Sequence, residues 1–349
     1  MVFLCNPKNE KFVKNSNKEY NNIMKIIGTG SALPEKVVTN DMLAGFLETS
    51  DSWITSRTGI KTRRLLSNET LGELAITAAH NAIESSGLDP KDIDYLICSN
   101  VANSYVSPSL GSILLAPLGC CCPCFDLNGA CAGLIYSLDI ADSFISTGRA
   151  KNILIVAAEE PSRFCNWHER ETTVLFGDAA SALVLTEGEG FKNFRLTGDT
   201  HTDVLYYKRS LENTPYDRVE EKTMPLVMNG REVFKLAVRA CIKDVDMILE
   251  KNDMKGDDID MYLLHQANLR IIDSIREHLE QPVEKFPTNL QRYGNTSSAS
   301  IGILIDELSR AGELKEGMNL LLSAFGGGFV TGATILKWSE IKYPEKIEN

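Results

Sequence analysis

The chain has 349 residues, of which 43% are hydrophobic and 24% charged, and a formal net charge of −11. The length allows two domains or one large duplicated one, and the acidic balance argues against nucleic acid or an anionic membrane as a partner, although a local basic patch for an acidic protein remains compatible with it. Because no apolar run reaches the roughly 18 residues of a membrane helix and the N-terminus lacks a signal-peptide core, we expect a cytoplasmic protein.

The first segment, 1–23, is polar, rich in Lys and Asn, and without periodicity, which predicts an N-terminal extension. A strand begins at Met24. Its Gly28-x-Gly30 pair is not a dinucleotide-binding fingerprint, because the third glycine is missing and Pro34 follows.

The next segment, 49–64, combines a helix start with Trp53 and four basic residues, Arg57, Lys61, Arg63 and Arg64. A tryptophan beside an arginine can stack on a purine while the guanidinium binds phosphate. The alternative is a solvated turn with a structural tryptophan.

Helices and strands then alternate. An amphipathic helix is predicted over 70–86, ending at Gly87, and strands over 94–99 and 152–158. Two strand-like runs surround a Gly-Asp turn within 173–185, and 188–228 is predicted to be irregular and polar.

The nine cysteines are an odd number in a long chain, which favours reduced thiols. Four of them, within 120–124, suggest a metal site at first sight. Adjacent cysteines point to opposite sides of an extended chain, however, and no second C-x-x-C pair or His-x-x-x-His follows. We interpret this cluster as loop and strand residues, and expect no metal.

A further cysteine, Cys131, lies where a turn at 126–129 leads into an apolar helix that stops at Gly148. Unpaired backbone N–H groups and the helix dipole at such a position lower a thiol pKa and favour a thiolate nucleophile. The alternative is a small apolar core residue.

The second half repeats the order of the first. A helix over 231–250, a strand over 260–264, a small-residue turn and helix over 295–308, and strands over 318–323 and 332–337 match earlier elements. Cys131 lies 17 residues before Gly148 and Asn295 lies 17 before Gly312 (148 − 131 and 312 − 295). We predict two α/β halves, 24–187 and 188–340, with a tail over 341–349 and central sheets covered by helices.

This symmetry brings Cys131, His265 and Asn295 to one place. Cys131 and Asn295 start equivalent helices, and His265 and Asn268 follow a buried strand, where open α/β sheets bind ligands. Taken singly, His265 fits a structural histidine and Asn295 a turn residue or cap. Together, in matched places of a repeat, they indicate a catalytic site.

Motifs along the chain resemble those of the thiolase-fold β-ketoacyl-acyl-carrier-protein synthase III enzymes, from about Lys25 to Trp338. They are Ile26-Ile-Gly-Thr-Gly-Ser-x-Leu-Pro34, Ser50-Asp-x-Trp-Ile-x-x-Arg-Thr-Gly-Ile60, Ala130-Cys-Ala-Gly133, His265-Gln-Ala-Asn-Leu-Arg-Ile-Ile272, Gly294-Asn-Thr-Ser297 and Ala324-Phe-Gly-Gly-Gly-Phe329. The resemblance implies a thiolase-like fold with duplicated βαβαβαββ halves in a five-layer αβαβα arrangement, and a homodimer.

The resemblance places a Cys-His-Asn triad on Cys131, His265 and Asn295. It implies that Cys131 takes an acyl group from acetyl-CoA or another acyl-CoA, with the N–H groups of Cys131 and Gly327 as the oxyanion hole. His265 and Asn295 then hold the enolate that malonyl-carrier protein forms on losing carbon dioxide. No metal or redox cofactor is implied.

Contacts to substrate also carry over from the resemblance. Trp53, Arg57 and Arg170 match family positions that hold CoA, and Arg231 could add a phosphate contact. Gln266, Arg270 and Lys235 match contacts for the carrier protein, although Glu277 and His278 make the basic patch thinner. Four residues are expected to line the pocket: Leu134, Phe176, Phe325 and Asn268.

Two other interpretations remain. The chain can be a synthase III-like acyltransferase or condensing enzyme of specialised metabolism, or a non-catalytic or zinc-binding scaffold. The pair His265 and Asn295 favours decarboxylative condensation that starts fatty acid synthesis.

Overall fold

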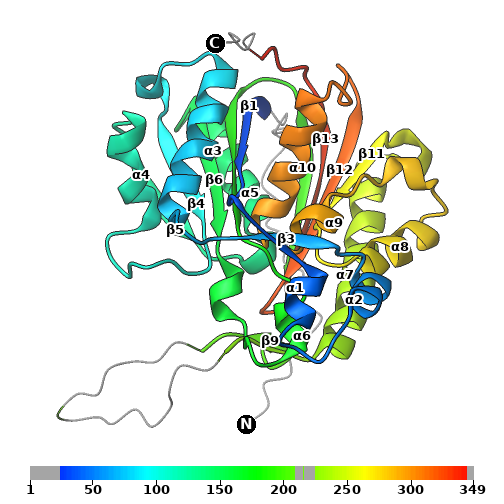
Figure 1. Ribbon diagram of the computed structural model, residues 1–349. Coiled ribbons are helices and arrows are strands. Elements are labelled where there is room, and N and C mark those ends of the chain that lie inside the picture. Colours follow the sequence, from blue (N-terminus) through cyan, green and yellow to red (C-terminus); the bar gives the residue numbers. More distant parts are fainter. Residues whose placement is uncertain (1–23, 209–214, 216–224, 344–349) are drawn as a thin grey trace.

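The computed structural model describes residues 24–208, 215 and 225–343 (Figure 1). The predicted extension, 1–23, and residues 344–349 of the predicted tail lie outside these residues. Within the tail, Ile341 is buried and the Tyr343 hydroxyl donates to Ser309 over 2.7 Å, so this part packs against the body of the protein.

The strands form two central sheets. Within the described residues, the first has the order β1-β7-β6-β4-β5, with bounds Met24–Ala32, Ala179–Glu187, Asn152–Glu159, Tyr95–Ser99 and Cys124–Leu127. The second has the order β11-β12-β13-β8, with bounds Met261–Leu264, Asn319–Gly326, Val330–Lys337 and Phe191–Gly198. Two small ribbons pair β2 (Lys36–Thr39) with β3 (Thr62–Leu65), and β9 (Leu205–Tyr206) with β10 (Val227–Met228).

The helices have the following bounds: α1 Asn40–Ala44, α2 Asp51–Thr58, α3 Leu71–Ser86, α4 Leu110–Leu118, α5 Gly133–Ser146, α6 Arg170–Thr173, α7 Gly230–Lys251, α8 Leu269–His278, α9 Leu290–Tyr293 and α10 Ala299–Arg310. Short 3-10 turns are η1 Pro90–Asp92, η2 Ala130–Ala132, η3 Pro161–Phe164, η4 Gly256–Asp258 and η5 Val283–Lys285.

The two sheets repeat one pattern, which confirms the predicted duplication. In the first, β1 pairs antiparallel with β7, β7 antiparallel with β6, and β6 parallel with β4. In the second, β8, β13, β12 and β11 pair with the same three orientations. The chain passes from one sheet to the other between β7 and β8, whereas the exact division at 187 and 188 remains a prediction.

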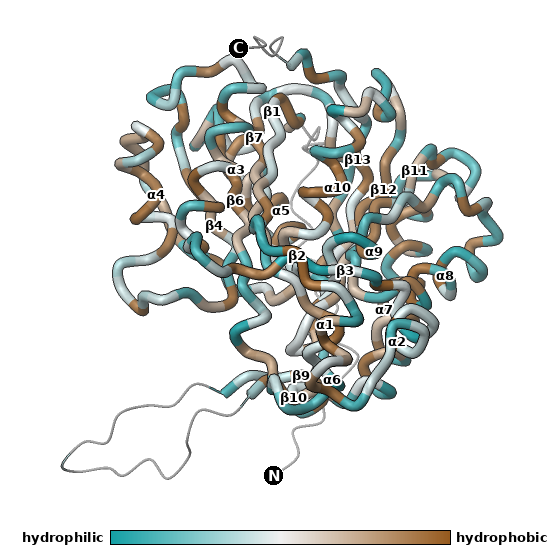
Figure 2. Tube along the Cα trace, in the orientation of Figure 1, coloured by the Kyte–Doolittle hydropathy of each residue, from teal (hydrophilic) through white to brown (hydrophobic). Residues whose placement is uncertain are grey.

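Hydrophobic packing sorts these elements into five layers. One apolar cluster joins α5 and α10 to the facing sides of both sheets. A second packs α3 and α4 on the outer side of the first sheet, and a third packs α7 and α8 on the outer side of the second. Figure 1 shows these layers side by side, and Figure 2 shows apolar residues concentrated along the strands and central helices. The fold is therefore the αβαβα arrangement that the motifs implied.

The pair Gly28 and Gly30 lies inside β1, where the strand passes directly over α3. A Cβ atom at Gly28 would come within 2.2 Å of the Ala82 carbonyl oxygen, and one at Gly30 within 2.2 Å of the Ala78 carbonyl oxygen. These glycines serve close packing between strand and helix.

Two predictions of local structure are wrong. Part of 188–228, predicted to be irregular, forms β8, which lies at the edge of its sheet and alternates polar and apolar residues, so that pairing with β13 defines it. The first strand-like run of 173–185 is mostly the end of α6 and a turn, with a single bridge between Phe176 and Asn295.

Candidate active site

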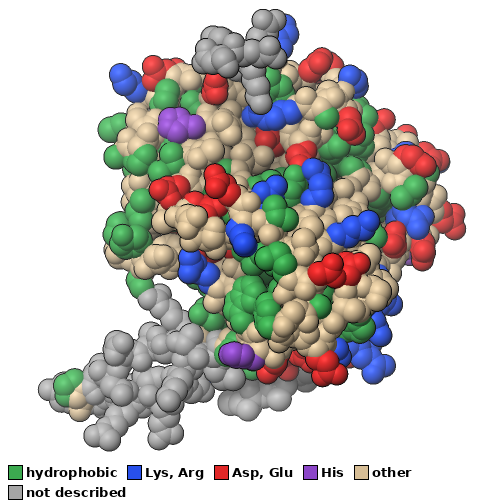
Figure 3. All heavy atoms as spheres, in the orientation of Figure 1, with side chains coloured by type: hydrophobic (Ala, Val, Ile, Leu, Met, Phe, Trp, Pro, Cys, Tyr) green, Lys and Arg blue, Asp and Glu red, His purple; other side chains and the backbone are tan. Residues whose placement is uncertain are grey.

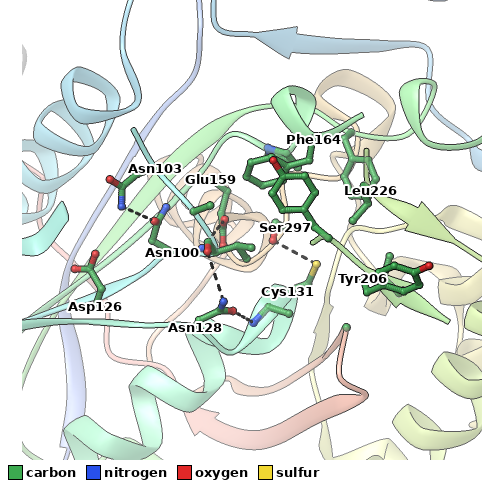
Figure 4. Close-up of a pocket in the computed structure, with 18 of the residues that line it drawn as sticks. Asn100, Asn103, Asp126, Asn128, Cys131, Glu159, Phe164, Tyr206, Leu226 and Ser297 are labelled. Carbon is green, nitrogen blue, oxygen red and sulfur yellow. Dashed lines mark hydrogen bonds between the residues drawn. The ribbon is translucent and has the colours of Figure 1, made fainter. Parts of the chain in front are cut away.

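Two cavities meet at Cys131. The larger, of about 570 Å³, is lined by Cys131 together with Asn100, Asn103, Asn128, Glu159, Phe164, Tyr206, Leu226, Ser297, Gly327 and others (Figure 4). The smaller, of about 120 Å³, is lined by Cys131, His265 and Asn295, with Phe176, Phe325 and Asn268 in its wall. The tertiary structure therefore brings the three predicted catalytic side chains to one cavity.

The backbone around Cys131 is unusually tight. Ala130 has a φ of 45°, and the turn η2 carries Cys131 just ahead of α5, so the cysteine precedes the helix and does not lie in its first turn. A Cβ atom at Gly326 would come within 2.6 Å of the Cys131 backbone nitrogen. Only glycine lets β12 approach the Cys131 amide this closely. Gly327, the predicted second oxyanion donor, lines the larger cavity with Cys131.

The resting thiol is not the thiolate that the helix position predicted. Burial raises the pKa of Cys131 to about 12, while a hydrogen bond from Ser297 and the residue's own N–H act in the opposite direction. Desolvation of the charged form therefore outweighs the backbone donors. The sulfur must lose its proton as it reacts.

His265 is a buried, neutral imidazole with one free nitrogen. Its Nδ1 lies 2.8 Å from the Ser300 hydroxyl, and its buried Nε2 has no hydrogen-bond partner within the described part of the chain. Burial lowers the pKa of His265 to about 3, and the edge of its ring packs against Phe325 with ring centroids 5.3 Å apart. When Ser300 donates to Nδ1, the proton is on Nε2, which can then donate to a ligand.

Asn295 is held by its backbone and by one side-chain atom. Its N–H donates to the Leu175 carbonyl over 2.8 Å, its carbonyl accepts from Gly177, and its Oδ1 accepts from the Ser297 N–H over 2.9 Å. Because Oδ1 is occupied in this way, the amide NH₂ group remains as a donor. The site thus offers two neutral donors next to a thiol.

Two predicted contacts are wrong in this structure. Gln266 is 1% exposed, and its amide is used internally, donating to the Leu264 carbonyl over 2.7 Å and accepting from the Asn289 N–H over 3.1 Å, so it presents no surface to a carrier protein. Leu134 is packed in the central core and is absent from the walls of both cavities described above. In each case the direction of the side chain follows from tertiary packing.

Two of the predicted CoA contacts, Arg57 and Arg170, lie against the third, Trp53. The Arg170 guanidinium stacks over its ring at 4.6 Å from the centroid and that of Arg57 lies at 5.7 Å. The neighbouring Arg63 is different, since it is fully buried and donates to Asn40 Oδ1 and to the Val174 carbonyl, which makes it structural. Asn268 caps α8 and also donates to the Arg57 carbonyl over 3.2 Å, linking this surface to the smaller cavity.

The remaining predicted surface contacts lie on α7 and α8. Arg231 and Arg270 are exposed, and the Lys235 ammonium is paired with Glu232 over 2.8 Å. Figure 3 shows acidic side chains among the basic ones around α8. Basic and acidic side chains are therefore mixed on this surface, and its role as a carrier-protein patch stays a prediction.

Sequence reasoning missed three polar residues at this site. Ser297 contacts the sulfur of Cys131, Ser300 orients His265, and Glu159 lies buried at the end of β6 beside them. The run of hydroxyl residues after Asn295 was a signal for the two serines, whereas no local pattern marks Glu159.

The cysteines of the 120–124 cluster differ in exposure, with Cys120 buried and Cys121 exposed. Among the residues that the structure describes, no group of three or more His, Cys, Asp or Glu side chains is arranged to hold a metal ion. In the same residues, no helix has the length and apolar character needed to cross a membrane.

Comparisons with known proteins agree with this geometry. Family models described as 3-oxoacyl-[acyl-carrier-protein (ACP)] synthase III and its C-terminal part match residues 125–203 and 249–338. A β-ketoacyl-[acyl-carrier-protein] synthase III of Clostridium acetobutylicum is 41% identical over 324 residues, covering 91% of this chain and 100% of the relative.

Two solved structures extend the likeness to three dimensions. The 3-oxoacyl-[acyl-carrier-protein] synthase III of Aquifex aeolicus VF5 matches with a TM-score of 0.84 and 39% identity, over 90% of this chain and 100% of that one. The priming β-ketosynthase of the R1128 polyketide biosynthetic pathway matches with a TM-score of 0.86 and 30% identity, over 93% and 98% of the two chains.

Proposed function

The chain belongs to the β-ketoacyl-[acyl-carrier-protein] synthase III family, and from this premise we propose that it is an acyltransferase that starts fatty acid synthesis. It takes an acyl group from acetyl-CoA or another acyl-CoA onto Cys131 and condenses it with malonyl-carrier protein. The observation that carries the proposal is the single cavity lined by Cys131, His265 and Asn295.

In the first step, the Cys131 sulfur attacks the thioester carbonyl of the acyl-CoA. The N–H groups of Cys131 and Gly327 stabilise the tetrahedral oxyanion, since preorganised donors act strongly in a site that excludes water. The bond to the CoA sulfur breaks and an acyl-cysteine remains. The larger cavity, of about 570 Å³, offers the space for the acyl chain.

In the second step, malonyl-carrier protein replaces CoA. His265 Nε2–H and the Asn295 amide donate to its thioester carbonyl, so that the enolate formed on loss of carbon dioxide is stabilised by two neutral donors. The neutral state of His265, whose pKa burial lowers to about 3, supports this donor role. The enolate attacks the acyl-cysteine and releases a β-ketoacyl product.

The surroundings of the site support the binding of both substrates. We assign CoA to the surface around Trp53, Arg57 and Arg170, which Asn268 links to the smaller cavity, and to Arg231 on α7. The carrier protein is assigned to Arg270 and Lys235. No metal or redox cofactor takes part, because acyl transfer and decarboxylation need only the groups named here. We further propose a cytoplasmic homodimer.

A second candidate is a condensing enzyme of specialised metabolism. The likeness to the R1128 priming β-ketosynthase supports it, since that protein is named for a polyketide pathway. The two candidates share the acyl-cysteine and the condensation, and differ in the acyl group and the carrier.

One experiment tests both. The protein is incubated with acetyl-, branched and longer acyl-CoAs, and the added mass is located by peptide analysis. Malonyl-carrier protein or malonyl-CoA is then added and the product identified. We expect the mass on Cys131 and a β-ketoacyl product. Absence of any acyl mass on Cys131 in the folded protein contradicts the proposal.

A further inference from the structure

A short polar chain reaches the Cys131 sulfur within the larger cavity. The Ser297 hydroxyl lies 3.3 Å from the Cys131 sulfur and donates to it. Glu159 lines the same cavity, and interaction with the Ser297 side chain lowers the pKa of its carboxyl. Figure 4 shows Ser297 between Glu159 and Cys131. Because a hydroxyl group rotates and both donates and accepts, Ser297 can join the thiol to the carboxylate.

A glutamate is unusual at a position as deeply buried as that of Glu159. It is 1% exposed, and it accepts from the Ser298 hydroxyl over 2.5 Å and from the Val101 N–H over 3.3 Å. In the described ranges, no Lys, Arg or His side chain forms an ion pair with it. A buried carboxylate without a cation is costly even when it is hydrogen-bonded, because neutral donors only partly replace the water that it loses. A purely structural role therefore explains the carboxyl group poorly.

The thiol needs a proton acceptor. Burial keeps the Cys131 sulfur protonated, and His265, which lies on the other cavity, uses its Nδ1 on Ser300 and is needed there as a donor. Burial raises the pKa of Glu159 to about 7, a suitable value for a group that accepts and returns a proton near neutral pH.

We propose that Glu159 acts through Ser297 to take up the proton that leaves Cys131 during acylation, and returns it when the second step releases the sulfur. This inference rests on the proposed function. As the sulfur–carbon bond forms, the S–H proton passes to the Ser297 oxygen and the Ser297 proton passes to the Glu159 carboxylate. The leaving CoA thiolate takes a proton from solvent. In the second step the enolate displaces the Cys131 thiolate, which recovers the proton from Glu159 by the reverse path.

The other titratable groups near the site should not obscure the titration of Glu159, because their pKa values are shifted away from neutral pH. Burial raises the pKa of the Cys98 thiol on β4 and of the Cys131 thiol in η2 above the ordinary value, and the negative charge of Glu159 raises both further. The pKa of His265, on the other cavity, is lowered to about 3. An inflection near pH 7 is therefore expected from Glu159. Since only the carboxylate accepts a proton, the rate of acylation rises with pH through this value.

The test compares Glu159→Gln and Ser297→Ala with the unsubstituted protein. The rate of Cys131 acylation by acetyl-CoA and octanoyl-CoA is measured by quenched mass spectrometry between about pH 5.5 and pH 9. Alkylation of Cys131 by iodoacetamide is followed over the same range. We expect each variant to be slower by roughly 10²-fold and to lose the inflection near pH 7, because a positioned base contributes on this order.

Two matched variants separate this role from a structural one. Ser298→Ala removes a donor to the carboxylate without touching Cys131, so the inflection should move to higher pH while the plateau rate remains. Glu160→Gln changes the neighbouring buried glutamate, which is paired with Arg163 over 2.8 Å, and should leave the profile unchanged. Alanine at position 297 is compatible with its φ of 51°, since Ala130 adopts 45°.

The outcomes are distinct. Glu159→Gln and Ser297→Ala proteins that keep the rate and the inflection overturn the inference. If neither acyl-CoA modifies the unsubstituted protein, the proposed function fails with these substrates, and the iodoacetamide profiles still decide whether Glu159 governs the thiol. If Glu159→Gln does not fold, as judged by circular dichroism, the profile of Ser297→Ala decides.

Discussion

The helices of the outer layers and those of the central layer begin in different ways. Each outer helix starts after a residue whose side-chain oxygen accepts a hydrogen bond from a backbone N–H of the first turn. These residues are Thr70 for α3, Ser109 for α4, Asn229 for α7 and Asn268 for α8. The central helices α5 and α10 have no such cap, and each follows a non-glycine residue with positive φ, Ala130 or Ser297.

The starts of the outer helices contribute to stability, whereas the starts of the central helices belong to the catalytic site. A side-chain cap stabilises a helix by about 1 kcal/mol, and the outer helices have it. The central helices are stabilised by burial between two sheets, and the segments just ahead of them hold Cys131 and Asn295. Substitutions at the two kinds of helix start should therefore change different properties.

The largest effect is expected at the start of α5. Cys131→Ala should abolish the acyl-enzyme, because no other cysteine among the described residues lines either cavity, and the overall reaction should fall to background. Peptide mass spectrometry after incubation with acyl-CoA checks this. Cys241→Ala is the matched control, since burial also raises the pKa of that thiol to about 12. Acylation that persists in folded Cys131→Ala contradicts the assignment.

The next effect is expected at Asn295, ahead of α10, and at His265. Alanine at either position should lower condensation by roughly 10²- to 10³-fold, the usual loss for one donor to an oxyanion, while acylation of Cys131 is retained. Product formation from malonyl-carrier protein and the acyl mass are measured in parallel. His278→Ala, at an exposed histidine, should leave both unchanged. If acylation and condensation fell equally in these variants, the proposed role of His265 and Asn295 in stabilising the enolate would be wrong.

A substitution on the surface around Trp53 should change the binding of acyl-CoA more than the rate of the chemical step. Arg170→Ala should raise the Michaelis constant for acyl-CoA by about tenfold, because it removes a guanidinium stacked over an aromatic ring. The rate constant of acylation at saturation should remain. Arg149→Ala, which removes a guanidinium stacked over Phe144 at 4.6 Å, is the control, and a similar rise there would show a nonspecific effect.

A substitution at the start of α3 should change the stability of the protein and leave its activity unchanged. Thr70→Ala removes one side of a capping box with Glu73 and should lower the free energy of unfolding by about 1 kcal/mol. Urea unfolding measures this change, and the rate of acylation should be unaffected. Thr77→Ala on the same helix removes only a bond to the Glu73 carbonyl and should have a smaller effect. An unchanged unfolding midpoint in Thr70→Ala would count against the cap.

The smallest effect is expected at the carrier surface. Arg270→Ala should raise the Michaelis constant for malonyl-carrier protein a few-fold, since an exposed charge contributes less than about 1 kcal/mol. The constant for malonyl-CoA should not change. Lys235→Ala should have a smaller effect, because its ammonium is paired with Glu232. Unchanged binding of the carrier in Arg270→Ala removes the docking assignment.

Local signals in the sequence were enough for much of the fold. The predicted helix over 70–86 has its cap at Thr70 and its stop at Gly87, as the structure shows, because caps and glycine stops depend on neighbouring residues. The repeat of strands and helices also predicted the duplicated sheets. The gathering of Cys131, His265 and Asn295 followed from that repeat and from the family motifs.

Long-range packing decided the rest. The strand β8 exists through its pairing with β13, and Gln266 turns inward because Leu264 and Asn289 need its amide. The Cys131 pKa depends on how deeply the two halves bury the sulfur. Glu159 and Ser297 come from opposite halves of the chain, so only the closed interface between α5, α10 and the sheets brings them into one cavity with Cys131.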